Sequence, residues 1–160
     1  MEYLVNNEIK ATKRLSKEIE KFPDTLIWEG EDMFTFKAVL KGPANTPYQG
    51  GEFTLKIKYP LEYPFKPPKI LYAVPVFHPD IEKNGYAYIS LIEDDWNPSI
   101  MIDKILAAFN QHLATVIYDD ADKDWCGYNI EAFNLWRDNR EEFKRIARDN
   151  TFKYAYTRED

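Results

Sequence analysis

The sequence predicts a single α+β domain over residues 1–160, because two kinds of hydrophobic period occupy separate parts of the chain. Apolar residues recur at helical spacing near both ends and at every second position in between. All ten prolines lie between Pro23 and Pro98, so the C-terminal third lacks the residue that breaks helix interiors. Neither an internal repeat nor a low-complexity linker divides the chain, which favours one domain at this length.

The N-terminal segment is predicted to be a helix, with Asn6 or Asn7 as its N-cap. Its apolar positions, at helical spacing, are Ile9, Leu15, Ile19 and Phe22. Its other face is basic and carries Lys10, Lys13, Arg14, Lys17 and Lys21. From composition alone, such a basic stripe is the solvated face of an amphipathic helix.

The middle of the chain is predicted to form antiparallel strands. Residues 34–40 and 53–59 alternate apolar and polar side chains, which is typical of strands with one buried face. The turn-rich segment 41–51 joins them as a hairpin, and Lys69–Tyr72 follows as a further strand.

The helical period returns at residue 102. An apolar stripe over residues 102–116 predicts a helix packed against the sheet, and an acidic loop follows at 119–124. Residues 130–136 predict a short helix. Asn139 with Glu142 resembles a capping box for a last helix. His112, on the first of these helices, is expected at the surface or its boundary.

Charge and composition exclude several classes of function. Apolar residues make up 44% of the chain, and 21 basic against 27 acidic residues give a net charge of −6. We therefore expect binding neither to nucleic acid nor to anionic membrane surfaces. Cys126 is the one cysteine, so an internal disulfide is impossible, and with only two histidines a metal site is not expected. No cofactor is expected either.

The N-terminus, MEYLVNNEIK, lacks the basic and then apolar pattern of a secretory signal. No apolar run approaches the ~18 residues that a membrane span requires. A reducing, intracellular location in the cytoplasm, the nucleus or both is therefore expected.

Four stretches of the chain combine turn residues, prolines and aromatic residues in a specific order. They are KGPANTPYQGGEF (41–53), YPLEYPFKPPKI (59–70), FHPDIEKNGYAYISLI (77–92) and WNPSIMIDKIL (96–106). Taken together and in this order, they resemble the ubiquitin-conjugating (UBC) fold. The closing REEFKRIARDNTFKYA (140–155) is also similar. The resemblance implies an N-terminal helix, a four-stranded antiparallel meander sheet, a central helix and two C-terminal helices. It also implies a role in the transfer of ubiquitin or a ubiquitin-like modifier.

The same resemblance identifies two departures at the catalytic positions. Family members carry a cysteine a few residues after the Asn-Gly pair, where it accepts the modifier as a thioester. Here Asn84 and Gly85 are present, and the cysteine position falls on Tyr88. The asparagine of the family's His-Pro-Asn segment is replaced by Asp80.

Both departures act against the same transition state. A phenol with a pKa near 10 is only about one part in a thousand ionised at pH 7, whereas a thiol is a few per cent ionised. An ionised Asp80 accepts hydrogen bonds but cannot donate one to a developing oxyanion. The sequence therefore favours a non-catalytic variant that binds modifier and partner proteins. The alternative is an active enzyme, in which Tyr88 replaces a native cysteine by engineering or Cys126 acts as a displaced nucleophile.

Further site residues follow from the resemblance. His78 is expected to hold the turn through backbone hydrogen bonds rather than to act as a base. Asp120 matches an acidic gate that orients an incoming lysine, beside a second acidic group at 93–95. A solvated acidic rim and a structural Cys126 packed near Trp125 are the plainer interpretations of these groups.

The resemblance also predicts partner-binding residues on two surfaces. The basic stripe of the first helix matches a surface that meets the activating enzyme, with Lys10, Arg14 and Lys17 as its candidates. Phe65, Pro98 and Ser99 match two loops that bind a ligase, although Ser99 stands where alanine is common. The expected partners are a modifier, an activating enzyme or an active conjugating enzyme, and a ligase.

Overall fold

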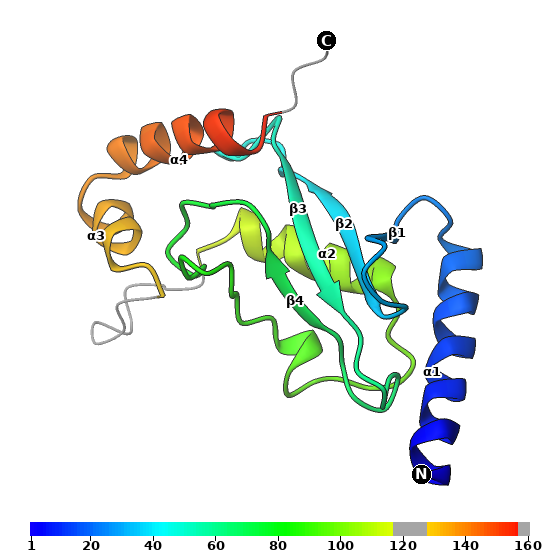
Figure 1. Ribbon diagram of the computed structural model, residues 1–160. Helices are drawn as coiled ribbons and strands as arrows, with labels where there is room; N and C mark the ends of the chain where they lie inside the picture. The colour runs from blue at the N-terminus through cyan, green and yellow to red at the C-terminus, as the bar shows by residue number, and fades with distance from the viewer. Residues whose placement is uncertain (117–127, 157–160) are drawn as a thin grey trace.

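A four-stranded antiparallel sheet with the strand order β1-β2-β3-β4 occupies the centre of the molecule (Figure 1). The computed structural model describes residues 1–116 and 128–156. The strands are β1 (Ile27–Trp28), β2 (Thr35–Lys41), β3 (Glu52–Lys58) and β4 (Lys69–Tyr72). Because every strand pairs with its neighbour in sequence, the sheet is a meander.

Alternation along the strands gives the sheet one buried and one outer face. In β2 and β3 the buried residues Phe36, Ala38 and Leu40 lie opposite Ile57, Leu55 and Phe53. The residues between them, lysines among them, point to the other side. The two-residue side-chain period of the sequence therefore sets which face enters the core.

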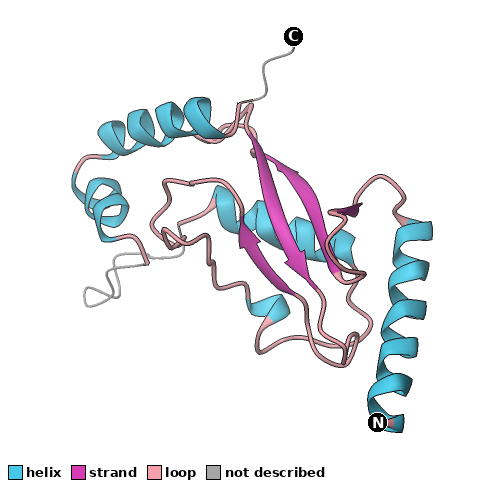
Figure 2. Ribbon diagram, viewed as in Figure 1, coloured by secondary structure: helices cyan, strands magenta, loops and turns pink. Residues whose placement is uncertain are grey.

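The helices lie behind the sheet, beside its β1 edge and on its opposite side (Figure 2). They are α1 (Glu2–Lys21), the 3-10 turn η1 (Ser90–Ile92), α2 (Ile102–Ala114), α3 (Ile130–Asp138) and α4 (Arg140–Tyr154). Helix α2 lies behind the sheet in Figure 1, where Phe109 packs edge-on against Tyr72 of β4. Helix α1 lies beside the β1 edge, and α3 and α4 lie together at the far side.

The α+β fold class and the order of elements are confirmed, as are the strands and helices predicted from periodicity. The family resemblance implied a fourth strand, but periodicity did not locate β1, because two residues are too short to show a period. The predicted N-cap at Asn6 or Asn7 is wrong. Helix α1 begins at Glu2, with both asparagines inside it, and its first turns extend beyond the rest of the fold in Figure 1.

The predicted capping box at the start of α4 is half formed. The side chain of Asn139 accepts a hydrogen bond from the backbone N–H of Glu142 at 3.2 Å. The backbone N–H of Asn139 instead donates to Leu135, since α3 ends where α4 begins, and the Glu142 carboxylate pairs with Arg145. None of the helices within the described ranges has the length and apolar character that crossing a bilayer requires.

Candidate functional site

The His-Pro-Asp turn (residues 78–80) is buried: His78 has no exposed surface and Asp80 is 2% exposed. Nδ1 of His78 accepts a hydrogen bond from the backbone N–H of Asp80 at 3.0 Å. Because Nδ1 accepts, we assign the ring proton to Nε2, which donates to the carbonyl oxygen of Thr115 at 3.1 Å. His78 thus joins the turn to the end of α2 through two backbone groups.

A second histidine packs against this turn. The rings of His78 and His112 stack with their centroids 5.4 Å apart, and His112 is 7% exposed. Burial and the neighbouring His112 lower the pKa of His78 to about 3, and burial lowers the pKa of His112 to about 4. Both imidazoles are therefore neutral at pH 7, with pKa values far from those of a general base. The expectation that His112 lies at the surface or its boundary is wrong, since its side chain on the last turn of α2 is buried.

The turn also contacts the start of α3. The carbonyl oxygen of Pro79 accepts hydrogen bonds from the backbone N–H groups of Tyr128 and Asn129, at 2.9 and 3.0 Å. Together with the bond from His78 to Thr115, these contacts connect the turn to chain on both sides of residues 117–127. The predicted acidic gate, Asp120, and the predicted alternative nucleophile, Cys126, lie outside the described residues.

The Asn84-Gly85 turn brings the next segment against β4. Gly85 has a φ of +93°, and a Cβ atom at this position would lie 2.2 Å from the carbonyl oxygen of Tyr72. Only glycine fits such an approach without displacing the strand. The carbonyl of Gly85 accepts from the N–H of Tyr72 at 2.9 Å, and the Asn84 side chain accepts from the N–H of Tyr86 at 3.0 Å. This turn therefore fixes where the residues after it lie.

After the turn, two tyrosines hydrogen-bond to the acidic turn (residues 93–95). Tyr86 donates its hydroxyl to Oε1 of Glu93 at 3.2 Å, and Tyr88 donates its hydroxyl to Oδ2 of Asp94 at 2.6 Å. Tyr88 is 38% exposed, whereas its neighbours Ala87 and Ile89 are buried. At the position predicted to carry the nucleophile, the chain thus has a surface phenol whose hydroxyl is hydrogen-bonded to a carboxylate.

These carboxylates keep both phenols protonated. The hydrogen bond to Asp94, followed by partial desolvation and the charges of Asp94, Glu93 and Asp95, raises the pKa of Tyr88 to about 12. Desolvation and the Glu93 carboxylate raise the pKa of Tyr86 to about 12. Within the described ranges, no group of three or more His, Cys, Asp or Glu side chains is arranged to hold a metal ion.

The residues predicted to bind a ligase lie at the surface. Phe65 is 62% exposed, and Pro98 and Ser99 are also exposed. Trp96 connects the two loops, because its indole N–H donates to the carbonyl oxygen of Pro64 at 2.9 Å. An exposed aromatic ring on a loop braced in this way is suited to a contact with another protein.

The three basic candidates on α1 are not equivalent. Lys10 and Lys17 are exposed, and the Lys10 ammonium lies 6.0 Å from the centre of the Phe65 ring. The side chain of Arg14 is only 16% exposed and turns inward. Its guanidinium donates to the carbonyl oxygens of Pro98 and Ile100, at 2.6 and 2.9 Å.

Arg14 belongs to a buried polar network that sequence reasoning missed. The Glu18 carboxylate lies 3.4 Å from the Arg14 guanidinium and accepts hydrogen bonds from the Tyr63 hydroxyl and from the backbone N–H of Ile102, the latter at 2.9 Å. Glu18 has no exposed surface. Helix α1 is therefore fixed to the start of α2 by this network, and the one local signal for it was a glutamate at an apolar position of the helical pattern.

The pairs formed by Tyr86 and Tyr88 with Glu93 and Asp94 were also missed. Their signal was present as two tyrosines two residues apart, followed by three consecutive acids. Side chains at such spacing lie on one face of an extended segment, so a single turn can bring acids to both.

Comparison with known protein families identifies the family of this chain. The model of the ubiquitin-conjugating enzyme family matches residues 4–151. The chain belongs to the ubiquitin-conjugating enzyme family. Membership implies interaction with ubiquitin-like modifiers, activating enzymes and ligases.

Solved structures agree with the family assignment. The domain of a Toxoplasma gondii ubiquitin conjugating enzyme is similar with a TM-score of 0.81 and 27% identity, over 89% of this chain and 98% of that chain. A protein assigned as a ubiquitin conjugating enzyme from Plasmodium yoelii is similar with the same TM-score and identity, over 93% of this chain and 97% of that one. The UBC fold predicted from the four sequence stretches is thereby confirmed.

Proposed function

We propose that this chain is a non-catalytic ubiquitin-conjugating enzyme variant, a binding module that works inside the cell beside an active conjugating or activating enzyme. The proposal rests on one observation: the hydroxyl of Tyr88, at the predicted nucleophile position, is hydrogen-bonded to the Asp94 carboxylate at 2.6 Å. Family membership supplies the pathway, and this contact supports the proposed absence of transfer.

The bonded phenol is a poor substitute for a thiol. With a pKa of about 12, roughly one Tyr88 phenol in 100,000 is ionised at pH 7. Its proton points to Asp94, and the three carboxylates of the acidic turn oppose the charge that ionisation would create. A cysteine at the same place would have a few per cent thiolate and a smaller side chain.

The residue at the position predicted to stabilise the oxyanion, Asp80, also disfavours catalysis. An asparagine there would offer an N–H donor, whereas ionised Asp80 offers only acceptors and a negative charge. Loss of one such donor typically costs ~100- to 1000-fold in rate. Asp80 is 2% exposed, so its side chain lies inside the turn and not at the surface.

The surfaces predicted to bind partners support the binding role. Two loops beside α1 expose Phe65, Pro98 and Ser99. The helix itself exposes Lys10 and Lys17. We therefore propose ligase contact at the two loops, and contact with an activating or active conjugating enzyme along α1. Asp120 is proposed as the residue of the acidic gate that orients an incoming lysine in this family.

A charging assay tests the lack of transfer. The purified chain, incubated with activating enzyme, ubiquitin and ATP, is expected to give no adduct that a thiol reagent removes. Tyr88→Cys, and Tyr88→Cys with Asp80→Asn, are the matched gain-of-function variants, and at least the double variant should form a reducible adduct. A reducible adduct on the unaltered chain would refute the proposal, and its loss in Cys126→Ser would identify Cys126 as the nucleophile.

A binding assay tests the module itself. Labelled ubiquitin, titrated with this chain, should show saturable chemical-shift changes in its NMR spectrum. The same titration with ubiquitin-like relatives should reveal which modifier is preferred. If no modifier and no partner enzyme binds, the chain is a scaffold outside the pathway and the binding role is wrong.

A further inference from the structure

The outer face of the sheet is rich in lysine, although the chain is acidic overall, with a net charge of −6. In the register of the sheet, Lys37 lies opposite Lys56, and Lys58 lies opposite Lys69. Like charges directly across a strand pair destabilise a sheet, so stability does not explain this arrangement. Lys37 is neutralised in part by Glu29 at 3.7 Å.

The lysines nearer to β4 are less compensated. Among residues 1–116 and 128–156, no carboxylate forms an ion pair with Lys56, Lys58 or Lys69. Hydrogen bonds from Phe34 and Thr35 are the main cause of the lowered pKa of Asp32, and the charge of Lys58 contributes less. On the exposed loop before β4, Lys66 lies 3.6 Å from Glu62. Lysines without partners at this end of the sheet leave a local excess of positive charge.

A groove of about 590 Å³ lies beside these lysines, between β4 and the segment that carries Tyr86 and Glu93. We call it the β4 groove, and its lining is Lys58, Tyr59, Pro60, Lys66, Pro67, Pro68, Lys69, Ile70, Leu71, Tyr86, Ala87, Ile92 and Glu93. Three cations face one carboxylate, and that carboxylate already accepts the Tyr86 hydroxyl. Prolines and aliphatic side chains form the rest of the surface.

The backbone of β4 is open along this groove. Strand β4 is the last of the sheet, so only β3 pairs with it. The N–H of Ala73 points to β3, where it bonds to Thr54, and the N–H of Tyr72 points the other way, to Gly85. By alternation, the N–H and C=O of Ile70 also point away from β3, and within the described ranges no backbone hydrogen bond reaches them there.

We propose that the β4 groove binds an extended acidic segment of a partner protein. The segment pairs its backbone with Ile70 at the open edge, and its carboxylates lie near Lys58, Lys66 and Lys69. Strand addition at a free edge provides backbone hydrogen bonds, and alternate side chains provide selectivity. The position of the groove is independent of whether Tyr88 is inert, so the inference does not rest on the proposed function.

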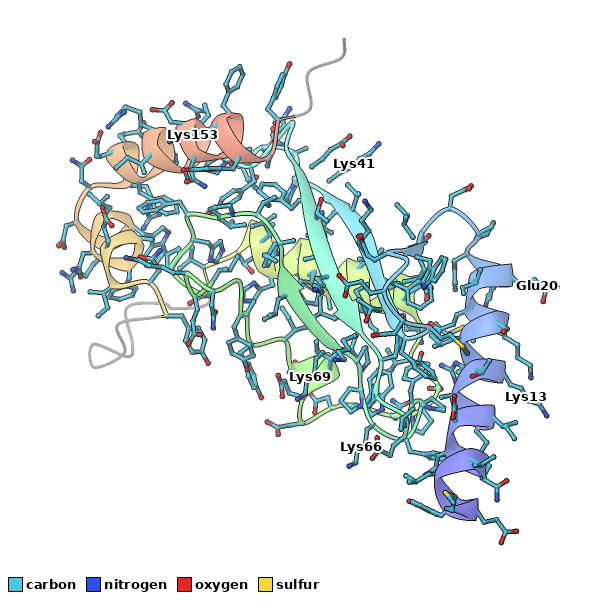
Figure 3. The ribbon with its side chains drawn as sticks, in the orientation of Figure 1. Lys13, Glu20, Lys41, Lys66, Lys69 and Lys153 are labelled. Atoms are coloured by element: carbon cyan, nitrogen blue, oxygen red, sulfur yellow. The ribbon has the colours of Figure 1, made fainter. Side chains whose placement is uncertain are left out.

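A polypeptide fits the groove better than other polyanions. The carboxylates Glu62 and Glu93 beside the groove oppose a long phosphate backbone or a membrane surface. The proline-rich wall and Leu71 offer apolar contacts that a valine or leucine side chain can use. Figure 3 shows Lys66 and Lys69 close to the start of β4, far from Lys153 on α4 and Lys13 on α1.

The test uses a fluorescent peptide of alternating glutamate and valine, with the lysine–valine peptide as its charge-reversed counterpart. Binding by anisotropy should be saturable for the acidic peptide only. Lys58→Glu with Lys69→Glu should weaken it at least about tenfold, whereas the exposed control Lys153→Glu should change it less than about twofold. Equal loss in the control, or equal binding of both peptides, would overturn the proposal. Tighter binding of single-stranded DNA or of phosphatidylserine vesicles than of the peptide would also overturn the proposal, and would identify that polyanion as the ligand.

Backbone pairing has its own readout. Peptides N-methylated on alternate residues come in two registers, and only one register blocks the edge that faces β4. One register should therefore lose binding and the other should keep it. Hydrogen exchange of the Ile70 amide should slow by about tenfold when the peptide is bound at saturating concentration. Equal binding of both registers, or unchanged Ile70 exchange, would contradict strand addition at this edge.

Discussion

Two regions that meet at the candidate site, the His-Pro-Asp turn and the segment of Tyr86 and Tyr88, are built in opposite ways. In the turn, His78 is fully buried and hydrogen-bonded to backbone at two ring nitrogens. In the segment, the Tyr88 side chain is at the surface and bonds to another surface side chain. Substitution of Tyr88 therefore alters chemistry with little effect on the fold, whereas substitution of His78 alters the fold itself.

The largest expected effect is a loss of stability in acid, which should come from the buried histidines and not from Tyr88. His78 and His112 have folded pKa values of about 3 and 4, against an ordinary value of 6.5. Because the unfolded chain binds protons first, the free energy of unfolding is highest above pH 6.5 and falls as the pH decreases. The two histidines together should remove about 6 kcal/mol between pH 7 and pH 4.

Urea unfolding at a series of pH values measures this loss. Asp32 and Glu142 have pKa values lowered from 3.8 and 4.5, so the range above pH 5 reports the histidines. His112→Gln should roughly halve the slope, and Tyr88→Phe should leave it unchanged. A stability that stays constant from pH 6.5 to 5 would show that the buried pair does not titrate as described.

Removal of the buried imidazole should have the next largest effect. His78→Ala loses two hydrogen bonds and leaves a cavity, with an expected cost of about 3 kcal/mol in the free energy of unfolding. The matched surface variant Tyr88→Ala should cost less than about 1 kcal/mol. Equal urea midpoints for the two variants would mean that the contrast between the two regions is wrong.

The smallest effect concerns the phenol itself. Asp94→Asn removes the negative charge and leaves a weaker, neutral acceptor for the Tyr88 hydroxyl, so the pKa of Tyr88 should fall from about 12 toward 10. Titration of tyrosinate absorbance, with Tyr88→Phe subtracted, follows that single group. An unchanged pKa would indicate that the bond to Asp94 does not form in solution.

Much of the site was predictable because its residues belong to short sequence motifs. The resemblance of residues 77–92 to the family identified Tyr88 and Asp80 without any coordinates. The same resemblance placed Phe65 in a ligase-binding loop, and its side chain is 62% exposed. The contact between Tyr88 and Asp94 was not predicted, because it depends on the direction of the chain after η1.

Long-range pairing explains the other misses. Arg14 was grouped with the exposed cations of α1, yet Pro98 and Ile100, far along the chain, present carbonyl oxygens to it. His112 was placed near the surface, since nothing local marks the partner that stacks on it. Lys58 and Lys69 belong to different strands, so their adjacency becomes visible only when the register is known.

The sequence by itself determined the α+β class, the order of elements, the family and the absence of cysteine at position 88, because periodicity, turn residues and motifs are local properties. Tertiary structure decided which polar groups meet. It turned Arg14 inward, buried both histidines together, bonded Tyr88 to a carboxylate and placed Lys58 opposite Lys69 beside the β4 groove. Such contacts depend on strand register and helix orientation, which are set by packing across the whole chain.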